Sequence, residues 1–250
     1  MNARTSTMQQ LALLDGGTVA PETWRVRPSA RARRLAVRVL PGGIVEIVVP
    51  RGTRPQAVQQ FVARHRSWID RKVVQYQPDL PEPGDGLPER IVYAASGQDF
   101  DVRYVEAPGA PRLQQAEGGI LTVTGECDRT ALVRHALQRF TMRMAHAVLL
   151  PWLQRVSSGS NLGFERLQIR RQRTRWGSCS RNGTISLNAC LLFQRPAVVN
   201  YLLIHELVHT RHMNHSRRFW AAVQRLEPDW QALDSALSQG WRSVPAWVLR

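Results

Sequence analysis

One apolar segment, residues 196–211, constrains this chain more than any other, because it carries two histidines at helical spacing. Pro196 suits the first turn of a helix, and the apolar residues after it form an inner face. His205 and His209 stand four residues apart, so their imidazoles lie one turn apart on the same face. The chain must therefore pack this helix with one face inward while it presents two imidazoles at one spot.

Glu206 follows the first histidine directly and projects about 100° around the helix from it. In that position it is badly placed as a third ligand but can reach a metal-bound water. The segment His205–His209 thus has the HExxH arrangement, in which two imidazoles bind zinc and a carboxylate acts as a base. Glu206 is also the only acidic residue between Glu165 and Glu227. A buried carboxylate there needs either a role or a partner such as an arginine.

A third metal ligand is available close to the helix. A catalytic zinc ion usually has three protein ligands and one open position for water. His212 lies three residues past His209, and its side chain leans toward the same face if the helix continues. We prefer His215, because the helix is expected to end near Met213 and a returning chain brings a donor from a new direction.

Several segments of the chain together resemble a known family. They are Arg175–Ser180, Ile185–Asn188, the HELVH helix, and Asn214–Ser216 with Phe219 and Trp220. The resemblance is to the YgjP-like metallopeptidases, which are related to the SprT and WLM zinc peptidases within the zincin group. It implies that His205, His209 and His215 bind one Zn²⁺ ion and that the adjacent glutamate is the catalytic base. It spans about residues 25–230 and leaves the chain past Trp230 unexplained.

These observations lead us to expect a zinc-dependent metallopeptidase that acts on protein or peptide substrates. Zinc lowers the pKa of its bound water, and Glu206 takes that proton and passes it to the leaving amine. Two other interpretations stay open. One is a metal-dependent hydrolase of a non-peptide bond, and the other is a non-catalytic, basic module associated with nucleic acid.

Before the metal-binding helix, the sequence predicts a strand over residues 167–175, a loop over residues 176–180 and a second strand over residues 183–188. An edge strand beside the metal can hold an extended substrate by main-chain pairing. Arg175, Trp176 and Gly177 are therefore candidate substrate-binding residues, and Gly177 permits a close approach of the backbone. For Trp176 a packing role is the favoured alternative.

Cys179 and Tyr201 each have more than one interpretation. Three interpretations of Cys179 are open: a metal ligand, a residue that blocks the zinc as a switch, and a small buried residue. The third is favoured. Tyr201 lies on the metal-binding helix, where it is more readily explained as a core aromatic than as an oxyanion donor. Neither residue can be assigned from its spacing alone.

The charge of the chain is unusual, because 34 basic residues against 19 acidic ones leave a net charge of +15, with Lys72 the only lysine. Such a balance suits an acidic partner, and association with nucleic acid through arginine-rich strands is one candidate; a solvated face is the simpler alternative. The arginines concerned are Arg25, Arg27, Arg31, Arg33, Arg34 and Arg38 in one run, and Arg166, Arg170, Arg171, Arg173 and Arg175 in the other.

Cysteine usage and hydropathy indicate the compartment. Three distant cysteines, Cys127, Cys179 and Cys190, make no disulfide framework. No apolar stretch is long enough for a membrane span or a secretory signal. We therefore expect a cytoplasmic protein without a membrane partner.

The fold class is predicted to be α+β in three parts. Residues 1–20 form a flexible tail, and residues 21–126 form a β-rich part with one helix from Pro55 to about Tyr76. Residues 127–250 form a zincin-like catalytic half, in which a long helix capped by Asp128 precedes the metal-binding helix and a small mixed sheet.

Overall fold

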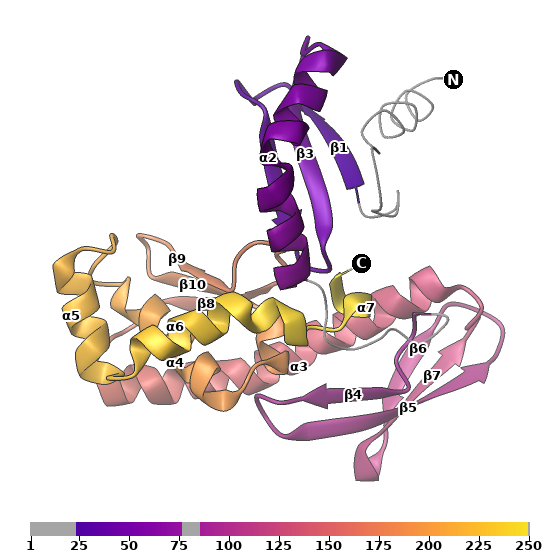
Figure 1. Ribbon diagram of the computed structural model, residues 1–250. Helices are drawn as coiled ribbons and strands as arrows, with labels where there is room; N and C mark the ends of the chain where they lie inside the picture. Colours follow the sequence, from indigo (N-terminus) through magenta and orange to yellow (C-terminus); the bar gives the residue numbers. More distant parts are fainter. Residues whose placement is uncertain (1–23, 77–85, 250) are drawn as a thin grey trace. The chain divides into compact units, whose positions relative to one another are not determined.

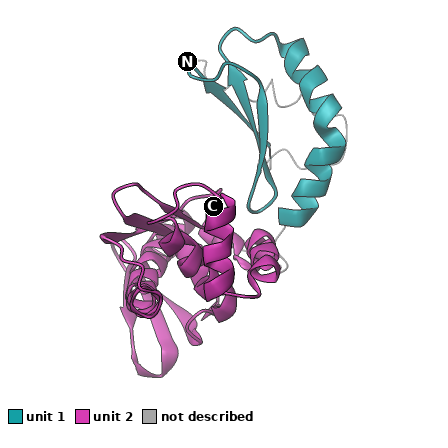
Figure 2. Cartoon of the chain, turned by 90° about the vertical axis from the view of Figure 1, so that its left-hand side faces the viewer, with its two compact units in different colours: residues 1–79 teal, residues 80–250 magenta. Residues whose placement is uncertain are grey.

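The computed structural model describes residues 24–76 and 86–249. The chain divides into two compact units, residues 1–79 and 80–250 (Figure 2). The division falls at Asp79 rather than after residue 126, because the strands that follow Arg90 pack with the helices of the second unit. The tail expected over residues 1–20 lies outside the described residues.

The first unit is a three-stranded sheet with one helix along it (Figure 2). Its elements are β1 (Trp24–Ser29), β2 (Ala36–Leu40), β3 (Ile44–Pro50) and α2 (Pro55–Tyr76). β3 is central, antiparallel to β2 and parallel to β1. Val45 and Ile47 of β3 share a core with Val58, Val62 and Ile69 of α2. The helix predicted from Pro55 to about Tyr76 is present, and residues 36–50 form two antiparallel strands joined by a turn.

A four-stranded sheet opens the second unit. It consists of β4 (Arg90–Tyr93), β5 (Gln98–Glu106), β6 (Arg112–Gln115) and β7 (Ile120–Gly125), in the order β4-β5-β7-β6. The hydroxyl of Tyr93, which is fully buried, lies 2.9 Å from that of Thr141 in the following helix. This contact ties the sheet to the helical part of the unit.

The second sheet of this unit is small and mixed. Its strands are β8 (Arg166–Arg170), β9 (Gly177–Cys179) and β10 (Thr184–Asn188), with β10 central, parallel to β8 and antiparallel to β9. The expected loop at residues 176–180 is therefore wrong in part, because Gly177–Cys179 forms an edge strand. The strand expected to reach Arg175 ends at Arg170 instead.

Asn188 explains why the chain leaves the sheet between β8 and β9. Its side-chain amide donates to the carbonyl oxygens of Gln172 at 2.6 Å and Arg175 at 2.8 Å. These bonds satisfy backbone acceptors that a continued strand would use in the ladder. The chain then re-enters the sheet at Gly177, where Leu187 is its partner.

The metal-binding helix of the sequence prediction is α4 (Pro196–Val208), which lies among other helices of the second unit (Figure 1). The other helices of the unit are α3 (Thr130–Ser160), α5 (Arg217–Leu226), α6 (Trp230–Gln239) and α7 (Ala246–Leu249), of which α7 packs on α3. α4 carries the HELVH segment and packs against α3, α5, α6 and the edge strand β9. The architecture is therefore α+β, as predicted, with this helix beside a small mixed sheet.

Two details of the helices differ from the prediction. α3 begins after Arg129, and no side chain caps it, so Asp128 does not serve as the cap; its carbonyl oxygen accepts from the backbone of Thr130. α6 and α7 were not predicted at all. Over the described residues, no helix is both long and apolar enough to cross a lipid bilayer.

Candidate metal centre

Three imidazoles converge at the end of α4. His205 lies in the last turn of α4, His209 caps its C-terminus, and His215 lies in the irregular segment before α5. The Nε2 atom of His205 lies 3.2 Å from that of His209 and 3.1 Å from that of His215. Two nitrogens bound to one tetrahedral zinc ion at about 2.0–2.1 Å are themselves about 3.3 Å apart. The spacing therefore fits three ligands of one ion.

Phe219 of α5 supports all three imidazoles. Its ring centroid lies 4.9 Å from that of His205, 4.4 Å from that of His209 and 4.7 Å from that of His215. Trp220 packs beside His215 at 5.5 Å. Because Phe219 is fully buried, α5 fixes the returning chain that carries His215 against α4.

The outer nitrogen of His209 has a backbone partner. Nδ1 of His209 lies 2.9 Å from the carbonyl oxygen of His212, and a carbonyl oxygen only accepts, so Nδ1 carries the proton. Nε2 is then left with a free lone pair on the side of the cluster. In metal sites this second partner fixes the tautomer and the orientation of the ring.

Burial favours the neutral form of His205 and His209. It lowers the pKa of His205 to about 3, with smaller contributions from the charges of His209 and His215. Burial also lowers the pKa of His209. Neutral imidazole is the form that binds a metal ion, so near pH 7 these two residues need not lose a proton first.

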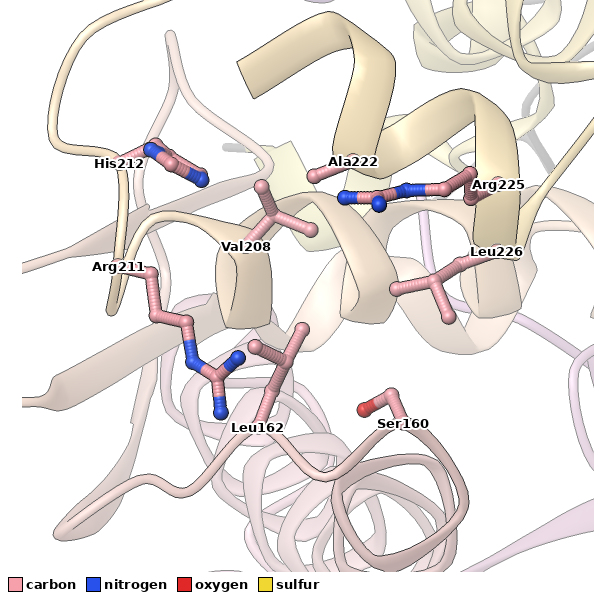
Figure 3. Close-up of a pocket in the computed structure, with 8 residues that line it drawn as sticks. All are labelled: Ser160, Leu162, Val208, Arg211, His212, Ala222, Arg225 and Leu226. Atoms are coloured by element: carbon pink, nitrogen blue, oxygen red, sulfur yellow. The ribbon is translucent and has the colours of Figure 1, made fainter. Parts of the chain in front are cut away.

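His212, the competing candidate for the third ligand, lies elsewhere. Its side chain lines a pocket of about 250 Å³, together with Val208 of α4 and Arg211 (Figure 3). The helices α3, α4 and α5 all end at this pocket, and helix C-termini favour cations. The guanidinium of Arg211 donates to the carbonyl oxygen of Asn161 at the end of α3, at 2.7 Å. The positive charge of Arg211 therefore complements the C-terminal end of α3.

Glu206 follows His205 on α4 and is buried, with only 4% of its surface exposed. Its Oε2 atom has no hydrogen-bond partner, and no arginine forms an ion pair with it among the described residues. Burial raises the pKa of its carboxyl group to about 8. An unpaired buried carboxyl group of this kind is costly and is typical of a functional site.

The edge strand β9 lies directly against this carboxyl group. A Cβ atom added at Gly177 would lie 2.9 Å from both Cγ and Cδ of Glu206, so only glycine permits the approach. Two residues along the strand, Cys179 is half-buried. Burial and the charge of Glu206 raise the pKa of its thiol to about 11, so the thiol is protonated. Cys179 is not part of the converging ligand cluster.

The other two candidate substrate-binding residues differ in their surroundings. Arg175 is exposed. Trp176 is 8% exposed and stacks on Trp241 of the C-terminal segment, with 4.0 Å between ring centroids and 22° between planes. The indole of Trp176 therefore makes the contacts of a packing residue.

Tyr201 and Asp234 form a contact that was not foreseen. The hydroxyl of Tyr201 donates to Oδ1 of Asp234 at 2.7 Å and lies 3.3 Å from Nδ1 of His205. Tyr201 is one turn before His205 on the same helix face, which was a usable signal. Asp234 lies on the unpredicted helix α6, so no local pattern pointed to it.

Comparison with known proteins gives one extensive match. Residues 33–240 match the family described as YgjP-like, metallopeptidase domain. Among solved structures, the crystal structure of the metallopeptidase zymogen of Pyrococcus abyssi abylysin is 24% identical, with a TM-score of 0.32. That match covers 34% of this chain and 87% of the abylysin chain. No curated protein matches this chain.

Proposed function

This chain belongs to the YgjP-like metallopeptidase family, and we propose that it hydrolyses peptide bonds with one zinc ion bound by His205, His209 and His215. The observation that carries the proposal is the convergence of these three imidazoles, whose ligand atoms all lie within 4.8 Å of one another. A set of three imidazoles is one of the donor sets of catalytic zinc sites, which keep a fourth position open. The donor set therefore favours a catalytic ion over a closed structural one.

Glu206 is the general base of the proposed reaction. A zinc ion in this site supplies Lewis acidity, which makes water nucleophilic near pH 7 and polarises the scissile carbonyl. In its ionised form Glu206 accepts the proton of the attacking water at Oε2, and the same carboxyl group then donates that proton to the departing amine nitrogen. The positive charge of a bound zinc ion would favour this ionised form over the protonated form that burial favours in the metal-free protein. The missing hydrogen-bond partner at Oε2 supports this role, because no protein donor occupies the lone pairs that must accept the proton.

The main chain of β9 is the proposed substrate-binding edge. In the order β8-β10-β9, the outer side of Gly177–Cys179 has no strand partner among the described residues. An extended peptide can add to such an edge by main-chain hydrogen bonds. We assign Gly177 to this main-chain contact and the exposed Arg175 to a side-chain contact. Trp176 holds the segment in place through Trp241.

The decisive experiment compares Glu206→Gln with wild type and with Glu165→Gln, an exposed glutamate outside the site. We expect Glu206→Gln to keep one zinc ion per chain and to lose peptide hydrolysis by about 10²–10⁴-fold, the usual contribution of a general base. The control variant should keep both. Unchanged hydrolysis in Glu206→Gln contradicts Glu206 as the base.

A panel of peptides and phosphoesters, assayed with and without chelator, tests the bond type. Peptide hydrolysis that a chelator abolishes is the expected result, and turnover of phosphoesters alone contradicts the peptidase proposal. A protein that binds zinc but hydrolyses neither class fits the binding module instead. A cytoplasmic location and an association with nucleic acid stay predictions of the sequence.

A further inference from the structure

Three polar groups line up from the proposed zinc site to α6. Nδ1 of His205 lies 3.3 Å from the hydroxyl oxygen of Tyr201, which in turn lies 2.7 Å from Oδ1 of Asp234. The tyrosine ring is fully buried, and α6 packs along α4 at this point (Figure 1). The chain of contacts therefore joins a candidate zinc ligand to a carboxylate on a neighbouring helix.

The direction of these contacts follows from the donors and acceptors. The hydroxyl of Tyr201 donates its proton to Oδ1 of Asp234. The tyrosine oxygen is then left as an acceptor, and Nδ1–H of His205 is the donor that faces it. This tautomer leaves Nε2 of His205 without a proton, and Nε2 is the atom that points at the other two imidazoles.

We propose that Asp234, acting through Tyr201, positions His205 for zinc and strengthens zinc binding. The inference rests on the proposed function, because it needs His205 to be a zinc ligand. A carboxylate linked to a ligating imidazole holds the ring in place and makes its nitrogen a better donor. Tyr201 and Asp234 are thus positioning residues, and α6 has a part in the site.

The experiment measures zinc affinity in the full chain by competition with a chromogenic chelator. The variants are Tyr201→Phe, Asp234→Ala and the double variant. We expect each single variant to bind zinc about 10–100-fold more weakly, the range for groups that support a ligand. The double variant should be no weaker than the weaker single variant by more than about threefold, because both residues act along one path.

Two control variants separate positioning from a general effect on folding. Asp229→Ala removes an exposed carboxylate at the start of α6 that caps nothing with its side chain, and zinc affinity should not change. Asp234→Asn keeps an acceptor for the tyrosine hydroxyl and should recover part of the affinity lost in Asp234→Ala. Urea unfolding of the metal-free variants identifies any that fail to fold. The visible spectrum of the cobalt-substituted protein should shift in Tyr201→Phe but not in Asp229→Ala.

The outcomes are distinct. If wild type binds no zinc, the proposed function fails. If wild type binds zinc and folded Tyr201→Phe binds it equally well, only the inference is overturned. Losses that multiply in the double variant also overturn it, since they mean that the two residues act separately.

Discussion

The backbone of Gly177 packs so closely against the side chain of Glu206 that a methyl group at residue 177 would overlap with it. A Cβ atom at residue 177 would lie 2.9 Å from the Cδ atom of the carboxyl group, closer than carbon atoms pack. We expect Gly177→Ala to displace either β9 or Glu206 and to reduce peptide hydrolysis by about 100-fold, as small misplacements of a catalytic group do. Zinc stoichiometry should stay at one.

Gly159→Ala is the matched control for this variant. Gly159 lies in α3, and nothing lies within 4 Å of the position that its Cβ atom would take. The same substitution there should leave hydrolysis unchanged. Full activity of Gly177→Ala would show that the carboxyl group tolerates displacement and would contradict its assignment.

The third ligand is tested by zinc analysis of two histidine variants. His215→Ala should lose tight zinc binding, because it removes one of the three converging nitrogens. His212→Ala should keep it, because His212 contributes only its carbonyl oxygen to His209 and alanine retains that oxygen. Equal retention of zinc in both variants would refute the choice of His215.

The free energy of unfolding of the metal-free protein should depend on pH through Glu206. Burial raises the pKa of this group from 4.5 to about 8, so between these values the folded state holds a proton that the unfolded state has released. Its contribution to stability is present below about pH 4.5 and is lost as the pH rises through 8. Each pKa unit corresponds to about 1.4 kcal/mol.

Urea unfolding with chelator at pH 5 and pH 8.5 measures this effect. Relative to wild type, Glu206→Gln should gain stability from the lower to the higher pH, because glutamine does not titrate. His205 and His209 have lowered pKa values and act in the opposite direction, but they do so in both proteins. A difference between the two proteins that is independent of pH would contradict the prediction.

Trp176 should matter more to stability than to substrate binding. Its buried indole stacks on Trp241 at 4.0 Å, and loss of a buried tryptophan costs about 3–5 kcal/mol. We expect Trp176→Ala to lower the free energy of unfolding by that amount, measured by urea titration. Trp68→Ala, in which the lost side chain is 39% exposed, should cost clearly less. A large rise in KM without loss of stability would instead assign Trp176 to the substrate.

Several residues on and after α4 could be assigned to the site from the sequence alone. The spacing of His205 and His209 depends only on helix geometry, so their shared face was predictable from the chain itself. His215 could be preferred over His212 because a turn, rather than a longer helix, brings a donor from another side. The hairpin after residue 35 and the helix after Pro55 were also predictable, since each has a clear period and a proline or glycine boundary.

The residues that escaped prediction depend on contacts between distant segments. β9 has three residues, too few to show alternation, and β10 defines it by pairing. Asp234 acquires its partner only because α6 packs on α4. The spacing of Trp230, Leu233 and Leu237 was a usable sign of α6 itself, but nothing in that pattern points to Tyr201.

The two helix-borne imidazoles differ in what mutation can change around them. The backbone carbonyl oxygen of residue 212 orients His209. Every amino acid has such an oxygen, so this contact places no requirement on the side chain at residue 212. His205 faces a hydroxyl that is itself held by a carboxylate, and loss of either leaves the other without its partner. Among related sequences, residues 201 and 234 should therefore change together. Residue 212 should vary independently of both.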